Sequence, residues 1–135
     1  MSFLLDTNAC IAVMNRHPIS VRKRLAQEII AGAAFAVSAI SVVELQYGVA
    51  KSQRVEANAA NLDDFLQPIR VLAFDDADAK IAGEIRVDLE RQGKPIGPYD
   101  CLIAAQGLRH NLCVVTANVS EFSRVEGLRW ENWAT

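Results

Sequence analysis

In SFLLDTN, residues 2–8, an apolar run suited to a buried strand stops abruptly at the carboxylate of Asp6, and this pattern is the strongest indication of the fold. Further apolar runs follow along the chain, and segments with helical periodicity separate them. Strands that alternate with helices indicate a parallel sheet with helices on both faces. In such sheets, functional sites gather beyond the carboxyl ends of the strands, which is the position of Asp6. We predict strands at residues 2–5, 34–38, 69–74 and 112–115, with 127–130 as a candidate fifth.

Length and composition indicate one domain over residues 1–135. Hydrophobic residues make up 51% of the chain, which is enough for a sizeable core. No apolar run approaches the roughly 20 residues of a membrane span, so we expect no membrane association. The start MSFLLDTN lacks the basic region of a signal peptide, and we therefore expect a cytoplasmic protein.

Charge and cysteine content bound the function further. The net charge of −2 attracts no nucleic acid globally, so a polyanion would have to be bound by a local patch or through a metal. Cys10, Cys101 and Cys113 have no close metal-type spacing, and only two histidines accompany them. This pattern argues against a structural zinc site and favours small, buried, reduced thiols.

Asp6 and Glu44 each admit a structural and a functional interpretation. Asp6 could cap a helix that begins near Ala9, and Asn8 could do the same, because Asp and Asn are favoured at N-caps. Glu44 follows Ser41 by three residues, which is a capping-box pattern, although its apolar neighbours favour a carboxylate directed into a cleft. Both interpretations stay open for each residue taken alone.

Polar residues in the second half of the chain show the same ambiguity. Asp100 complements the dipole at the start of an almost uncharged helix, but the stiff loop GKPIGP at 93–98 would also hold its side chain in one place. After the fourth strand, Ser120 or Asn118 could cap a short helix that carries Glu121 and Phe122. Thr116 could orient a neighbouring carboxylate by a hydrogen bond.

The remaining charged and aromatic residues are expected to be structural or solvent-exposed rather than functional. Arg22, Lys23 and Arg24 form a helix face that we expect to be solvated, although it could touch phosphates. Trp130 and Trp133 are expected to cover the sheet edge. The acids expected at solvated helix starts are Asp63, Asp64, Asp75, Asp76 and Asp78, with Asp75 or Asp76 as a helix cap.

Carboxylates that converge on one crevice repel each other, and without a cation some of them bind protons because their pKa values rise. A divalent ion such as Mg²⁺ or Mn²⁺ relieves this repulsion and takes oxygen ligands by preference. Such an ion can contact a phosphodiester oxygen and help to generate hydroxide. A protein with a net charge of −2 could therefore cut nucleic acid through a bound metal.

Four blocks of the sequence resemble, in the same order, the VapC toxins, which are PIN-domain ribonucleases of bacterial type II toxin–antitoxin systems. The blocks are LLDTN (4–8), SAISVVELQYGV (38–49), GKPIGPYDCLIAAQ (93–106) and VVTANVSEFSRVEGLRWENW (114–133). The GKPIGPYD segment is similar to the enteric-type branch of this family. The resemblance implies a three-layer α/β/α PIN fold with a central, mostly parallel sheet of four to five strands, and Mg²⁺-dependent endonucleolytic cleavage of RNA.

The resemblance also implies roles for individual residues. Asp6, Glu44 and Asp100 match the acidic triad of the family and are the expected metal ligands. Many PIN nucleases carry a fourth acid where this chain has Asn118, so Glu121 is the candidate that supplies the missing charge. The expected supporting residues are Thr116, which would orient Asp6, together with Asn118 and Asn8.

The partners implied by the resemblance are an RNA substrate and an antitoxin. The leading candidate for the substrate is initiator tRNA, cut in the anticodon loop. We expect a homodimer and a hetero-oligomer with a VapB-type antitoxin, whose tail blocks the acidic pocket. Contact with operator DNA is expected only through the antitoxin.

Three alternatives remain at this stage. A receiver domain for signalling would use Asp75 or Asp76 as phosphoacceptor, but it needs an acidic pair after the first strand and a lysine after the last, and no lysine follows Lys94. A phosphatase of the D-x-D type lacks its second acid, because Asn8 stands there. A catalytically weak PIN protein that acts only by binding stays open because of Asn118.

Overall fold

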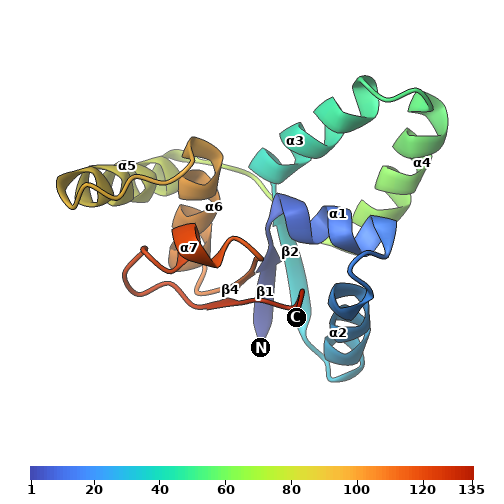
Figure 1. Cartoon of the computed structure of the whole chain (residues 1–135), viewed down its shortest axis with the longest axis horizontal. Helices are drawn as coiled ribbons and strands as arrows, with labels where there is room; N and C mark the ends of the chain where they lie inside the picture. The colour runs from blue at the N-terminus through green and yellow to red at the C-terminus, as the bar shows by residue number, and fades with distance from the viewer.

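A five-stranded parallel sheet forms the centre of the molecule, and the computed structural model describes residues 1–135 (Figure 1). The strand order is β3-β2-β1-β4-β5, so the first strand of the chain is the middle one. The predicted α/β class with a mostly parallel sheet is confirmed, and all paired strands run parallel. The strands are β1 (Ser2–Leu5), β2 (Ala34–Ser38), β3 (Arg70–Leu72), β4 (Cys113–Val115) and β5 (Trp130–Glu131), so β5 starts only at the end of the predicted 127–130.

Helices cover both faces of this sheet and give three layers (Figure 1). Phe3 and Leu5 of β1 pack into one buried apolar cluster with residues of α1 to α4, whereas Leu4 packs into a second cluster with residues of α5, α6 and α7. A central strand that is buried on both faces explains the uninterrupted apolar run before Asp6. The helices are α1 (Thr7–Asn15), α2 (Ile19–Ile30), α3 (Ala39–Ala50), α4 (Val55–Leu66), α5 (Asp76–Arg91), α6 (Pro98–Arg109) and α7 (Val119–Phe122).

The start of α3 differs from the sequence-based expectation. The helix begins at Ala39, and its cap is Ser38, whose Oγ accepts a hydrogen bond from the Ile40 amide at 3.0 Å. The predicted capping box of Ser41 and Glu44 is therefore wrong, because both residues lie inside the helix. Their side chains are free for other contacts.

Asp78 is the second correction, because its side chain is fully buried rather than solvated. The sequence analysis predicted Asp75 or Asp76 as the cap of this helix, and the structure shows that Asp75 caps α5. Asp75 also forms a capping box with Asp78. The Asp78 carboxylate also accepts hydrogen bonds from Gln106 and Arg109, each at 3.1 Å. Burial alone raises the pKa of Asp78, but these bonds and the Asp75 amide hold it below its ordinary value. This buried group fixes α5 against α6, the helix that carries Asp100.

The C-terminal segment packs where the sequence predicts an aromatic cover. Trp133 is buried and meets Phe3 edge-on, with 5.0 Å between ring centroids. The Arg24 guanidinium lies 5.0 Å from the centroid of the Trp133 ring and pairs with Glu131 at 3.0 Å. The sequence analysis expected the helix face with Arg24 to be solvated. In the structure, Arg24 instead contacts the C-terminal segment.

Two expectations from composition can be compared with the structure. All three cysteines are buried and form no disulfide, as predicted. None of the helices combines the length and the apolar character that a membrane crossing requires.

Candidate active site

The register of the three central strands brings polar residues level at one edge of the sheet. Leu5 of β1 pairs with Val37 of β2 and with Val115 of β4. The next residue of each strand is polar and buried, namely Asp6, Ser38 and Thr116. The carboxyl edge predicted to hold the site is therefore where the apolar interior gives way to a row of polar groups.

Asp6 is both a helix cap and a buried carboxylate. Its Oδ1 accepts a hydrogen bond from the Ala9 amide at 2.7 Å, and α1 begins before Ala9, earlier than predicted. Asn8 lies inside α1, so it is not the cap. Burial is the main cause of the raised pKa of Asp6; a hydrogen bond from Thr116 opposes the rise, and the negative charge of Glu44 adds to it. The structural and functional interpretations of Asp6 are thus compatible.

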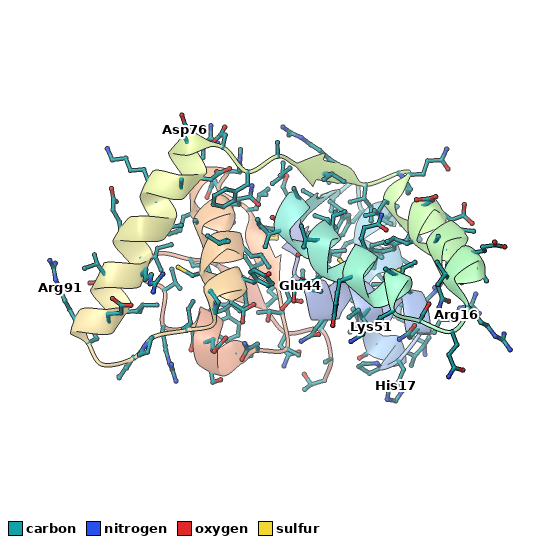
Figure 2. All side chains as sticks on the ribbon, turned by 90° about the horizontal axis from the view of Figure 1, so that it is seen from above. Arg16, His17, Glu44, Lys51, Asp76 and Arg91 are labelled. Atoms are coloured by element: carbon teal, nitrogen blue, oxygen red, sulfur yellow. The ribbon has the colours of Figure 1, made fainter.

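Glu44 accepts a hydrogen bond from a hydroxyl group that the sequence interpretation missed. Figure 2 looks onto the carboxyl edge and shows Glu44 on the part of α3 that faces α6. Thr7 Oγ1 lies 2.7 Å from Glu44 Oε1 and 3.0 Å from the Oγ of the buried Ser41. A hydroxyl has one hydrogen, so Thr7 donates to the carboxylate and accepts from Ser41. Because Thr7 directly follows Asp6, this contact ties α3 to the end of β1.

Asn118 joins the two carboxylates on the other side of the edge. Its Nδ2 donates to Asp100 Oδ2 at 2.9 Å and to Glu121 Oε2 at 2.6 Å. Asn118 occupies the N-cap position of α7, as one predicted alternative holds, but its side chain accepts no hydrogen bond from a backbone amide, and Ser120 lies inside the helix. The Gly97 amide donates to Glu121 Oε1 at 3.1 Å, which links the loop before α6 to α7. The stiff loop thus positions Glu121 as well as Asp100.

Asp100 and Glu121 share a proton when no cation is bound. Burial raises the pKa of Asp100 to about 7, and the hydrogen bond and the charge of Glu121 add to the rise. The pKa of Glu121 is lowered, above all because it accepts the hydrogen bond from Asp100. One proton therefore stays on Asp100 up to neutral pH.

The four acids form two subgroups at one edge, Asp6 with Glu44 and Asp100 with Glu121. The two subgroups interact electrostatically, because the charge of Asp6 also raises the pKa of Asp100. None of the four forms an ion pair with a lysine or arginine. With the side chains as they stand, no three acids lie close enough to hold one metal ion. The oxygen-only donors, the uncompensated charge and the retained proton suit a divalent cation, provided that side-chain rotation draws the subgroups together.

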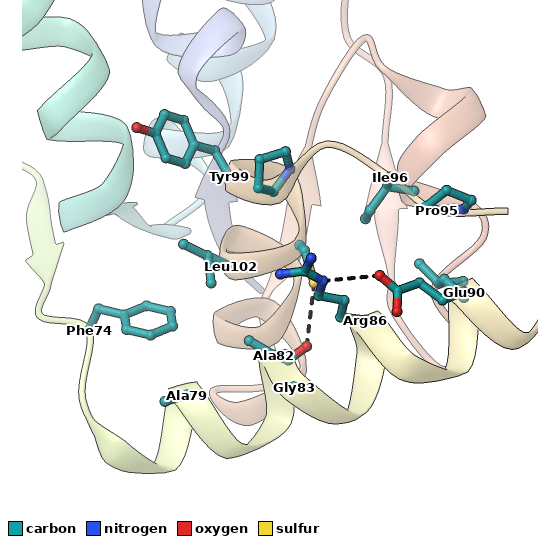
Figure 3. Close-up of a pocket in the computed structure, with 13 residues that line it drawn as sticks. Phe74, Ala79, Ala82, Gly83, Arg86, Glu90, Pro95, Ile96, Tyr99 and Leu102 are labelled. Carbon is teal, nitrogen blue, oxygen red and sulfur yellow. Dashed lines mark hydrogen bonds and ion pairs between the residues drawn. The ribbon is translucent and has the colours of Figure 1, made fainter.

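One cavity is lined by none of these acids. It has a volume of about 540 Å³ and lies between α5, the loop before α6 and the start of α6 (Figure 3). Its walls are mostly apolar, and its cation Arg86 pairs with Glu90 at 3.1 Å. None of the predicted site residues lines it. The acidic edge, and not this cavity, is therefore the candidate active site.

Comparison with known proteins agrees with the fold and with the acidic edge. Residues 3–128 match the family model of the PIN domain, so the chain belongs to the PIN-domain family. Within this family it falls among the VapC ribonuclease toxins of toxin–antitoxin systems. It is 42% identical to the tRNA(fMet)-specific endonuclease VapC of Shigella flexneri, over 99% of each chain. It is 40% identical to ribonuclease VapC2 of Rickettsia felis, over 98% of each.

Solved structures give the same result. The chain matches the structure of VapBC2 from Rickettsia felis bound to a promoter DNA fragment with a TM-score of 0.90 and 38% identity, over 98% of this chain and 99% of that chain. It matches DNA-bound VapBC from Salmonella typhimurium with a TM-score of 0.88 and 38% identity, over 98% of each chain. The receiver and phosphatase alternatives are thereby excluded.

The structure gathers most of the predicted site residues. Asp6, Glu44, Asp100, Glu121, Thr116 and Asn118 all lie at the carboxyl edge. Asn8 differs, because it is exposed and makes no hydrogen bond to any of the acids. Sequence interpretation missed Thr7 and the Gly97 amide. Thr7 could have been found from the sequence, because it is a hydroxyl residue directly after Asp6 at the end of the strand. It was missed because only carboxylates were considered as candidates there.

Proposed function

We propose that the protein is a metal-dependent endoribonuclease whose active site is the acidic edge. The observation that supports this most is the gathering of four carboxylates from separate parts of the chain, without a basic partner and with a proton retained on Asp100. PIN nucleases are in general metal-dependent. Mg²⁺, with Mn²⁺ as a substitute, matches a set of oxygen donors. When bound, the ion would polarise the scissile phosphodiester and lower the pKa of a water molecule.

The chain's own residues would hold and assist this ion. Asp6 and Asp100 are the principal ligands in this proposal. Glu44 binds the ion directly or through water, or orients the attacking water, and the Thr7 hydroxyl fixes the carboxylate orientation that either role needs. Asp100 has to lose its proton before it can act as a ligand.

The remaining polar residues have supporting roles. Glu121 supplies the negative charge that a fourth acid would bring, and Asn118 keeps Glu121 beside Asp100. Thr116 orients Asp6 through its hydroxyl. Asn8 is exposed beside this edge, where it would meet substrate rather than metal.

Substrate and partners are proposed from the relatives. Two of them, from Shigella flexneri and Salmonella typhimurium, are tRNA(fMet)-specific endonucleases at 42% and 38% identity, so initiator tRNA, cut in the anticodon loop, is the proposed substrate. VapBC complexes of relatives bound to DNA support an antitoxin partner for this chain, with promoter DNA contacted through the antitoxin. We further propose a homodimer that assembles with its antitoxin and acts in the cytoplasm.

The proposal is tested by removing single charges at the edge. Asp6→Asn and Asp100→Asn should abolish Mg²⁺-dependent cleavage of initiator tRNA, and cell toxicity, while circular dichroism shows an unchanged fold. Asp64→Asn, which alters an exposed acid on α4, is the matched control and should cleave like wild type. Normal cleavage by a folded Asp6 or Asp100 variant would contradict the assignment.

The alternative of a catalytically weak binding protein makes a different prediction. It gives no cleavage with wild type in Mg²⁺ or Mn²⁺, although antitoxin still binds. Mapping of new RNA 5′ ends after induction in cells identifies the RNA and the bond that is cut. Ends that appear with wild type and are absent with Asp6→Asn would support the nuclease.

A further inference from the structure

A second cavity, of about 170 Å³, borders the acidic edge. It lies between α1, the turn from α1 to α2, the end of β4 and the C-terminal segment. Thr116 lines this cavity and also hydrogen-bonds Asp6, and Ala117, the next residue, lines it too. A group bound here would therefore sit next to the proposed scissile phosphate. We call this cavity the base pocket, and the residues on which the inference rests are Asn8, Ile11, His17, Pro18, Asn132 and Trp133.

The walls of the base pocket suit a neutral, planar ring with polar edges. No carboxylate, lysine or arginine lines it, in contrast to the neighbouring edge. Ile11, Pro18 and Trp133 form apolar walls. The side chains of Asn8 and His17 make no hydrogen bonds within the protein, and Asn132 uses only its Oδ1, which accepts from the Ala134 amide at 2.9 Å. Unused donors and acceptors on apolar walls are what recognition of an unpaired base requires.

Three arginines lie close to residues that line the base pocket. Arg16 directly precedes His17, and Figure 2 shows both beyond the end of α1, on the side of the molecule away from α5. Arg22 directly follows Val21, which lines the pocket, and Arg24 stacks on Trp133. Arg22 donates a hydrogen bond to the Val13 carbonyl at 3.0 Å, and Arg24 is already paired with Glu28 and Glu131. The exposed Arg16 is therefore the cation that is free to neutralise a phosphate beside a bound nucleotide.

We infer that the base pocket holds one nucleobase of the RNA strand, next to the bond that is cut. This inference rests on the proposed ribonuclease function and adds a specificity site to it. Single-stranded RNA is recognised by bases turned out of the stack onto side chains, and loss of one such base lowers binding by about tenfold to a hundredfold.

The test combines altered enzyme with altered RNA. The probe is initiator tRNA with an abasic nucleotide on one or the other side of the cleaved bond, as mapped with wild type. Wild type should lose about tenfold to a hundredfold in kcat/KM with one of the two abasic RNAs. Ile11→Trp fills the pocket, and Asn132→Asp keeps the bond to Ala134 but removes the amide donor. Both variants should lose activity on intact RNA and show little further loss on that abasic RNA.

Controls separate the possible outcomes. Asn15→Ala changes an exposed amide at the end of α1, outside the pocket, and should behave like wild type with every RNA. Wild-type cleavage that is indifferent to both abasic positions would overturn the base pocket alone. The base pocket would also be overturned if the folded pocket variants cleaved RNA normally and only bound antitoxin more weakly, because the cavity would then be a protein contact. Absence of any cleavage by wild type would overturn the proposed function together with the inference.

Discussion

Replacing Asn118 by aspartate tests whether an amide at this position balances the two acids beside it. In the structure, one amide nitrogen donates to both Asp100 and Glu121. Asn118→Asp removes both hydrogen bonds and sets a third carboxylate against the other two. Without metal the folded state should therefore be destabilised, whereas a divalent ion should be bound more tightly because one more negative oxygen ligand is available.

The size of this effect follows from the contacts that are lost. A hydrogen bond to a charged group contributes about 1.5–3 kcal/mol, and the lower value applies at this half-buried site, so two bonds give about 3 kcal/mol. Repulsion among three carboxylates at pH 8 adds to this loss. For a chain of this length, about 3 kcal/mol lowers the Tm by about 10 °C. Saturating Mg²⁺, at about 100 times its Kd, should return about 2.7 kcal/mol.

The assay is thermal and urea unfolding at pH 8, with EDTA and then with Mg²⁺. Asn118→Ala is the matched control, because it loses the same two bonds without gaining a charge. It should be destabilised in EDTA but should gain no more from Mg²⁺ than wild type does. The reasoning is refuted if Asn118→Asp is as stable as wild type in EDTA, or if Mg²⁺ stabilises both variants equally.

Three further predictions concern positioning, pH and the scaffold. Thr7→Val removes the donor to Glu44 and should lower kcat by about tenfold or more, with recovery in Thr7→Ser, as steady-state cleavage kinetics will measure. In EDTA the raised pKa of Asp100 stabilises the fold fully below the unfolded pKa near 4, and this contribution is lost as pH rises through about 7. Urea unfolding should therefore show wild type losing stability from pH 5 to pH 8, and Asp100→Asn losing less. Asp78→Asn breaks a buried ion pair and should cost about 3 kcal/mol in thermal unfolding, while the exposed Asp75→Asn costs much less.

Local patterns were sufficient for the architecture. The apolar run before Asp6 and the alternation of strands with helices predict a parallel sheet with Asp6 at its carboxyl edge, since strand burial and helix periodicity are local properties of sequence. Predictions from local patterns were wrong where two residues within a few positions could each serve as the helix cap. Ser38 and Ser41 are both hydroxyls near the start of α3, and spacing to Glu44 favoured the wrong one.

Which acids are candidates, and through the order of the sequence blocks which family contains them, could be predicted without the structure. Their pairing follows from the packed fold: Asp100 shares a proton directly with Glu121 while Asn118 donates a hydrogen bond to each of them, and Thr7 donates to Glu44. Such pairings join residues as many as 37 positions apart. They depend on strand register and on the packing of α3 and α6, which bring distant side chains within 3 Å and which no local spacing encodes.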